Sequence, residues 1–174
     1  MDATFLRRII GLLAAVLSTG AVAQDNGTAE GFARAVVVEP LTITALDELR
    51  FGVLVQPLAA GTISVDPDNQ ITTSGGVTVE ATLSTATRSR GAATFILVGE
   101  ANRRFIIQGK NKITLSNGSA TMSVSQVRAN TSFGQGRFDS SGQFLLRVGG
   151  RLDVAAAQAP GLYTGTFTIR VVYQ

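Results

Sequence analysis

The sequence predicts an all-β protein, an antiparallel β-sandwich of the immunoglobulin-like type, and three observations support this prediction. Short runs of β-branched and apolar residues recur along the chain, and turn-forming residues separate them. No segment keeps a helical period over three turns, and residues 155–158 suffice for one turn at most. Hydrophobic residues make up 45% of the chain and glycines number 19, which is typical of one packed core joined by tight turns.

The chain begins with a segment typical of a cleaved secretory signal peptide, residues 1–23. A short basic region precedes an apolar stretch over residues 9–17, and an A-x-A cleavage site ends at Ala23. The alternative is a membrane anchor, but this apolar stretch is shorter than the roughly 20 residues that a spanning helix needs. We therefore expect an exported protein whose mature chain begins at Gln24 and contains no transmembrane helix.

The mature chain is expected to comprise an N-terminal extension, residues 24–34, and a sandwich domain over residues 35–174. Pro40 interrupts the first expected strand and indicates an edge position, a bulge or a strand switch, because proline lacks an N–H group. Residues 92–98 form a continuous apolar run that predicts a buried strand, and Asn117-Gly118 predicts a hairpin turn. The expected strands cover residues 35–46, 49–55, 61–65, 77–83, 92–98, 104–108, 112–115, 121–127, 143–148, 151–154 and 161–173.

Composition argues against most enzyme classes, because cysteine, histidine and tryptophan are all absent. The chain therefore has no disulfide, no Cys/His zinc site and no Ser-His or Cys-His dyad. The pattern Asp66-x-Asp68-Asn69 resembles the start of a calcium loop but lacks the glycine and glutamate that such a loop requires, so a turn is expected. We expect a non-enzymatic protein without metal or cofactor. Its scattered basic residues argue against a nucleic-acid partner.

The C-terminal segment is the most informative part of the chain. From Tyr163 onward, apolar or small residues alternate with mostly polar ones, which predicts a strand that buries one face. The residues of the apolar face are Gly161, Tyr163, Gly165, Phe167, Ile169, Val171 and Tyr173.

This alternation, together with the penultimate Tyr173 and the upstream Gly161, resembles the C-terminal signature of chaperone–usher pilins. The resemblance implies a pilin-like sandwich that lacks its final strand, so that a periplasmic chaperone pairs with the C-terminal strand by β-strand addition. An outer-membrane usher and further copies of the chain or related pilin subunits are the other implied partners. The implied location is the periplasm and then a fimbria at the bacterial surface. Many such pilins carry a disulfide, which this chain cannot form.

A second pattern covers nearly the whole mature chain and is similar to a bacterial exported family of unknown function that is often placed among fimbrial subunits. This likeness implies a β-sandwich and no known catalysis. The matching residues are Pro40, Leu49, Phe51, Gly52, Gly149, Leu152, Gly161, Tyr163, Gly165 and Tyr173.

If the sandwich lacks a strand, the donor that completes it in the next subunit is expected before the first core strand, within residues 24–38. One face of this segment is uninterrupted but small, and we take it as the candidate donor face: Ala29, Gly31, Ala33, Ala35 and Val37. The other face carries Phe32, Val36 and Val38 but is interrupted by Arg34. The segment is equally consistent with the plain start of the first strand.

Two other functions stay open at this point. A self-contained secreted or surface binding module, such as an adhesin, is compatible with the same fold, although the aromatic content of 6% is low for a carbohydrate-stacking site. An enzyme is the third option, and the absence of histidine and cysteine weighs against it.

Overall fold

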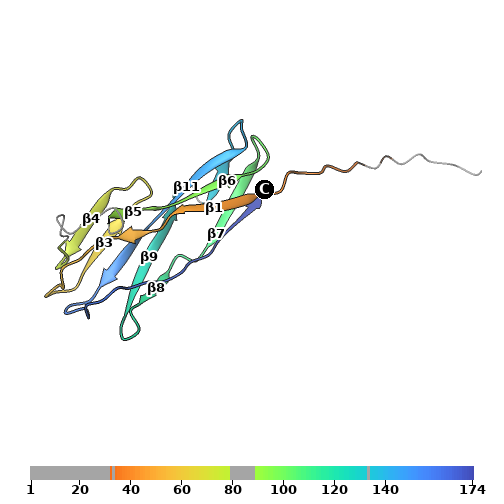
Figure 1. Ribbon diagram of the computed structural model, residues 1–174. Coiled ribbons are helices and arrows are strands. Elements are labelled where there is room, and N and C mark those ends of the chain that lie inside the picture. The colour runs from red at the N-terminus through yellow and green to blue at the C-terminus, as the bar shows by residue number, and fades with distance from the viewer. Residues whose placement is uncertain (1–31, 33, 79–88, 133) are drawn as a thin grey trace, which may run out of the picture. The chain divides into compact units, whose positions relative to one another are not determined.

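Figure 1 shows the chain in a computed structural model, which describes residues 32, 34–78, 89–132 and 134–174. Residues 37–174 form one compact unit, which contains all the described strands. The expected signal peptide and nearly all of the expected extension lie outside the described residues. Within the described ranges there is no helix and every strand pair is antiparallel, which confirms the predicted all-β sandwich.

The largest sheet contains seven strands, and the long strand β11 is its central element. The first half of β11 pairs with β6 and its second half with β3, while β9 pairs with residues 148–153 of β11. Arg151 has partners in both β3 and β9, so these two strands lie on opposite edges of β11. The strands of this sheet are β1 (Thr42–Asp47), β3 (Gly61–Val65), β4 (Ile71–Gly75), β6 (Ala93–Val98), β8 (Ile113–Ser116), β9 (Thr121–Ala129) and β11 (Gln143–Val154).

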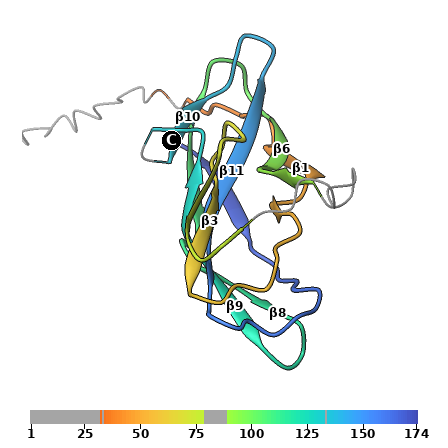
Figure 2. The ribbon, with the colours of Figure 1, turned by 90° about the vertical axis from the view of Figure 1, so that its left-hand side faces the viewer.

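Two smaller sheets complete the sandwich. The order of the three-stranded sheet is β10 (Gln135–Arg137), β7 (Arg104–Gly109) and β12 (Ile169–Tyr173), so the C-terminal strand is one of its edges. The two-stranded sheet pairs β2 (Arg50–Phe51) with β5 (Arg90–Gly91). Figure 2 shows β11 crossing the middle of the sandwich, with β1 and β6 together on one side of it.

The core consists of two apolar clusters, and β11 contributes to both. Leu146 and Val148 belong to the cluster around Phe105, which packs 4.7 Å from Phe138 between ring centroids. Leu152 and Val154 belong to the cluster that contains Ile63. The remaining buried members of the two clusters are Phe51, Val65, Val77, Ala92, Ala93, Leu97, Ile113 and Val124.

Several strand boundaries differ from those expected. The first strand begins at Thr42 rather than at residue 35, so Pro40 precedes the strand and does not interrupt it. As expected, this strand is an edge strand, and it has a register shift between Ala45 and Asp47. Residues 143–148 and 151–154 are one continuous strand, so the Gly149-Gly150 pair lies within β11 and is not a turn. A side chain at Gly149 would collide with the carbonyl oxygen of Val65, which explains the glycine by close packing.

Three strands, β4, β5 and β10, were not expected, and most of the expected strand at 77–83 lies outside the described residues. The C-terminal ladder is shorter than expected, because only residues 169–173 pair continuously. The expected hairpin at Asn117-Gly118 is confirmed: it joins β8 to β9, and Asn117 Oδ1 accepts the backbone N–H groups of Ser119 and Ala120 at 3.0 and 2.8 Å.

Candidate interface at the C-terminal strand

The C-terminal segment runs along β8 and then along β7. Thr164 exchanges two backbone hydrogen bonds with Ser116, of 2.8 and 3.0 Å, and residues 169–173 pair with β7 in register from Gly109 to Phe105. A side chain at Gly165 would collide with the carbonyl oxygen of Thr114, so the small residue there permits close approach to β8. Gly161 has a φ of 143° and lies against the side chain of Asn117.

The apolar face of this segment points into the sandwich, yet it is incompletely covered. Phe167, Ile169, Val171 and Tyr173 all pack against the Phe105 cluster, but each is only partly buried. Phe105 on the neighbouring strand β7 is fully buried, with 0% of its surface exposed. The C-terminal strand therefore carries an inward face that the described part of the domain does not fully cover.

The outer edge of the strand is also free. Gln174 donates its backbone N–H to the carbonyl of Arg104. On the opposite side of β7, Ile107 donates its backbone N–H to the carbonyl of Gly134. The even-numbered residues of β12 therefore face β7, and the odd-numbered residues point their backbone groups to the other side. Among the described residues, none bonds to the backbone groups of Phe167, Ile169, Val171 or Tyr173 on that side.

Strand β1 forms a second free edge. It pairs with β6 on one side only, and all six of its residues are exposed, including Ile43 and Leu46. Ile43 pairs with Leu97, which is fully buried, so Ile43 also points toward the interior and is nevertheless 37% exposed. Within the described residues, the uncovered inner surface therefore occurs at both β1 and β12.

The two free edges run alongside each other in opposite directions. Residue 39 lies beside Tyr173, and Phe95, the β6 partner of Ala45, makes an edge-to-face contact with Phe167 at 6.2 Å between ring centroids. Figure 1 shows β1 and the C-terminal strand meeting at the end marked C. We call the region between residues 39–57 and residues 161–173 the open side of the sandwich.

Tyr173 closes one end of the open side. Its hydroxyl donates to the carbonyl of Glu39 at 2.9 Å and accepts the backbone N–H of Glu100 at 2.8 Å. The guanidinium of Arg103 lies over the tyrosine ring, 5.4 Å from its centre. The penultimate aromatic residue thus joins the C-terminal strand to the segment that leads into β1.

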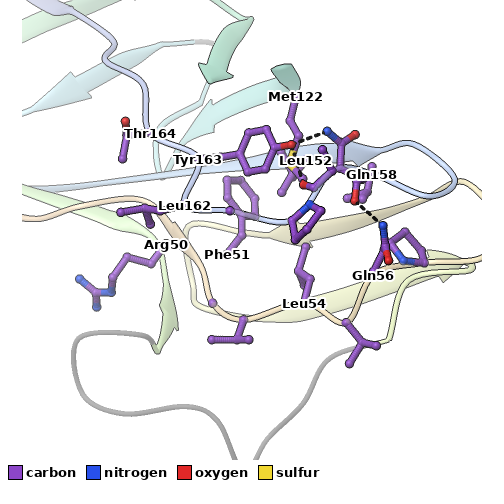
Figure 3. A pocket seen from close by; sticks show the side chains of 18 of the residues that line it. Arg50, Phe51, Leu54, Gln56, Met122, Leu152, Gln158, Leu162, Tyr163 and Thr164 are labelled. Carbon is purple, nitrogen blue, oxygen red and sulfur yellow. Dashed lines mark hydrogen bonds between the residues drawn. The ribbon is translucent and has the colours of Figure 1, made fainter. Parts of the chain in front are cut away.

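At the other end, the open side widens into a cavity of about 740 Å³. Figure 3 shows Tyr163 and Leu162 on the C-terminal segment and Phe51 and Leu54 on the segment that follows β1. The hydroxyl of Tyr163 accepts from Gln158 Nε2 at 2.8 Å and donates to the carbonyl of Ala159 at 2.7 Å. Apolar side chains from β9 and β11 also line the cavity: Met122, Leu152 and Val154.

Of the sequence-predicted residues of the C-terminal strand, Ile169, Val171 and Tyr173 lie on β12. The other four lie in the segment that leads into β12, where only an isolated bridge at Thr164 is formed: Gly161, Tyr163, Gly165 and Phe167. Of the candidate donor residues, Ala29, Gly31 and Ala33 lie outside the described residues, and Ala35 and Val37 are exposed and belong to no strand. Leu54 and Met122 were not predicted, because a short apolar run does not show which of its residues will border a cavity.

The open side offers apolar surface and backbone groups rather than reactive side chains. Its ion pair joins Arg50 to Asp47 at 3.3 Å on the surface. Among the described residues, no group of three or more potential metal-ligating side chains occurs, and no helix is long and apolar enough to cross a membrane. The arrangement is suited to binding another polypeptide strand.

Residues 41–173 match the family described as a domain of unknown function (DUF4402), which covers most of the chain and nearly all of the sandwich. No curated protein and no solved structure matches the chain.

Proposed function

The chain belongs to the DUF4402 family, whose function is unknown, and we propose that it is a non-enzymatic structural subunit of a bacterial surface filament. In this proposal, subunits assemble by β-strand donation: the N-terminal segment of one subunit fills the open side of the next. The single observation that carries the proposal is that two unpaired edges, β1 and β12, lie alongside each other over inward apolar side chains that are incompletely covered.

Free strand edges are normally blocked or covered, because their unpaired backbone groups recruit other strands. An added strand gains main-chain hydrogen bonds, and its alternate side chains set the register against the surface beneath. The partly buried Phe167, Ile169 and Val171 would supply that surface along β12, and the cavity beside Tyr163 would take a side chain at the far end.

The N-terminal segment of a second copy is the occupant that we propose. Residues 34–40 belong to no strand, and Val36 and Val37 are 69% and 95% exposed. We keep Ala29, Gly31, Ala33, Ala35 and Val37 as the candidate donor face. Because donor and acceptor are different parts of the chain, each contact is head-to-tail and the assembly grows as an open filament.

The likeness to chaperone–usher pilins adds the remaining parts of the proposal. A periplasmic chaperone would occupy the C-terminal strand before assembly, and an outer-membrane usher would exchange it for the next subunit. Export through the signal peptide would bring the subunit to the periplasm, and the filament would carry it to the cell surface.

Thermal and urea unfolding of the mature chain, residues 24–174, tests the proposal with a peptide of residues 24–38. A peptide that binds the native state stabilises it by about 2.7 kcal/mol at a hundredfold excess over its dissociation constant. We expect the unfolding midpoint to rise with this peptide and not with a scrambled peptide of the same composition. A stable monomer that ignores the peptide would contradict strand donation and favour a self-contained binding module.

A further inference from the structure

A second hollow, of about 730 Å³, lies on the outer face of the large sheet and shares no residue with the cavity of the open side. Its walls come from β9, from β11 and from the turn that joins β3 to β4. Gly149 and Gly150 form part of its lining, so the surface of β11 carries no side chain there. The turn lies close to β11, because the backbone of Val65 and Asp66 packs directly against Gly149.

Three arginines line this hollow. Arg147 and Arg151 flank the glycine pair on β11, and Arg128 of β9 is the strand partner of Gly149. The buried neighbours Val148 and Leu152 point into the core, so the arginines lie on the opposite, outer face.

The acidic residues of the hollow leave this positive charge incompletely balanced. Asp66 Oδ1 accepts the backbone N–H groups of Asp68 and Gln70, both at 2.8 Å, and thereby builds the turn. Asp68 pairs with Arg147 at 2.9 Å, and Asp153, which does not line the hollow, pairs with Arg151 Nε at 3.3 Å. Carboxylates therefore balance two of the three arginines. Among the described residues, Arg128 has no ion pair, and its guanidinium donates to the neutral Gln126 Oε1 at 3.3 Å.

The backbone beside Arg128 is strained. The pairing of β9 with β11 shifts register between Gly149 and Arg151, and Gln126 adopts a φ of 49° in this bulge. A positive φ is uncommon for a residue other than glycine, asparagine or aspartate. Bulges re-aim side chains and are frequent beside binding sites. Here the bulge places the polar, exposed side chain of Gln126 at the hollow next to Arg128.

We propose that this hollow binds the carboxylate of an acidic sugar, with Arg128 and Arg151 as the groups that contact the carboxylate. Guanidinium groups match the planar, two-oxygen geometry of a carboxylate. Hydroxyl and amide side chains surround the arginines and would bond to sugar hydroxyls: Ser64, Thr72, Gln126 and Asn130. Asn130 is already fixed, because it bonds to the backbone of Leu145 and Arg147. This proposal does not depend on filament assembly.

Calorimetric titration of the mature chain with trigalacturonate tests this site, and its methyl ester serves as the neutral control ligand. We expect Arg128→Gln and Arg151→Gln each to weaken binding roughly tenfold, because each removes a charge-assisted hydrogen bond. Arg137→Gln on β10 is the matched control, since it removes one exposed arginine on the other sheet. Thermal unfolding of each variant confirms that it is folded.

Three outcomes would overturn the proposal. They are a lack of measurable trigalacturonate binding, equal binding of the methyl ester, and a loss for Arg137→Gln as large as that for Arg128→Gln. The last result would indicate unspecific attraction by the basic protein.

Discussion

At the residue scale, single polar groups fix the parts of the chain that border the open side. The hydroxyl of Tyr173 joins Glu39 to the loop at Glu100, and the hydroxyl of Tyr163 joins the far end of the C-terminal segment to residues 158–159. Each tyrosine therefore combines an apolar ring with a polar hydroxyl that makes two hydrogen bonds. The hydroxyl of Tyr173 bonds to distant segments, whereas that of Tyr163 bonds to residues that shortly precede it.

Tyr173→Phe is expected to loosen the segment before β1 while leaving the ring packed. The variant keeps the contact with Phe138, at 6.0 Å between ring centroids, but removes both hydroxyl hydrogen bonds. We expect a loss of about 1–2 kcal/mol in the free energy of unfolding, measured in urea, and faster amide exchange around residue 39. Tyr163→Phe, the matched control, also loses two hydrogen bonds but should leave exchange near residue 39 unchanged. Equal exchange near residue 39 in Tyr173→Phe and the wild type would show that the hydroxyl does not hold this segment.

At the element scale, turns and strands differ in how well the sequence indicates them. The strand at residues 61–65 and the Asn117-Gly118 hairpin were predicted, because β-branched runs and turn residues act locally. Strand β4 was missed because it is a mostly exposed edge, so its residues do not alternate between apolar and polar. Residues 143–148 and 151–154 were predicted as two strands separated at the glycine pair, yet they form the single strand β11. Close packing of Gly149 against Val65 requires glycine there, and that contact is not visible in the sequence.

The candidate site was likewise predicted only in part, because the sequence shows local patterns but not contacts between distant segments. The alternation of the C-terminal strand was read from residues 161–173, and its odd-numbered side chains do point inward. Its cavity was not predictable, because Met122 and Leu54 come from distant parts of the chain and meet Tyr163 only in the fold.

The turn between β10 and β11 should make stability depend on pH. The backbone N–H of Gln143 and the hydroxyl of Ser141 bond to Asp139 and lower the pKa of its carboxyl group. A lowered pKa in the folded state adds stability above the unfolded pKa of about 3.9, and this contribution is lost as the pH falls through the folded value. Asp139→Asn should therefore be less stable than the wild type near neutral pH.

Urea unfolding of both proteins between neutral and strongly acidic pH measures this effect. The difference between wild type and Asp139→Asn should shrink as the pH falls below about 4. Ser140→Ala in the same turn is the control, because it changes no ionisable group, and its difference from the wild type should stay constant. A difference for Asp139→Asn that does not vary with pH would contradict the role of the ionised carboxylate.

At the scale of the whole domain, β11 holds the sandwich together, while the edges of β1 and β12 that border the open side remain unpaired among the described residues. The two core clusters both depend on β11, so the domain has one continuous framework. The edges β1 and β12 run alongside each other, with Tyr173 at one end and the cavity beside Tyr163 at the other. A single inserted strand would pair with both edges and cover the inward side chains, which is the physical basis of the proposed assembly.

Residue-resolved amide exchange along the C-terminal strand tests this central claim most directly. In the mature chain alone, the amides of Ile169, Val171 and Tyr173 should exchange fast, whereas those of Arg170 and Val172, which face β7, should exchange slowly. Addition of the peptide of residues 24–38 should slow the three odd-numbered amides selectively. Slow exchange of these amides in the free subunit, or no change at saturating peptide, would contradict the proposal that the open side accepts a strand.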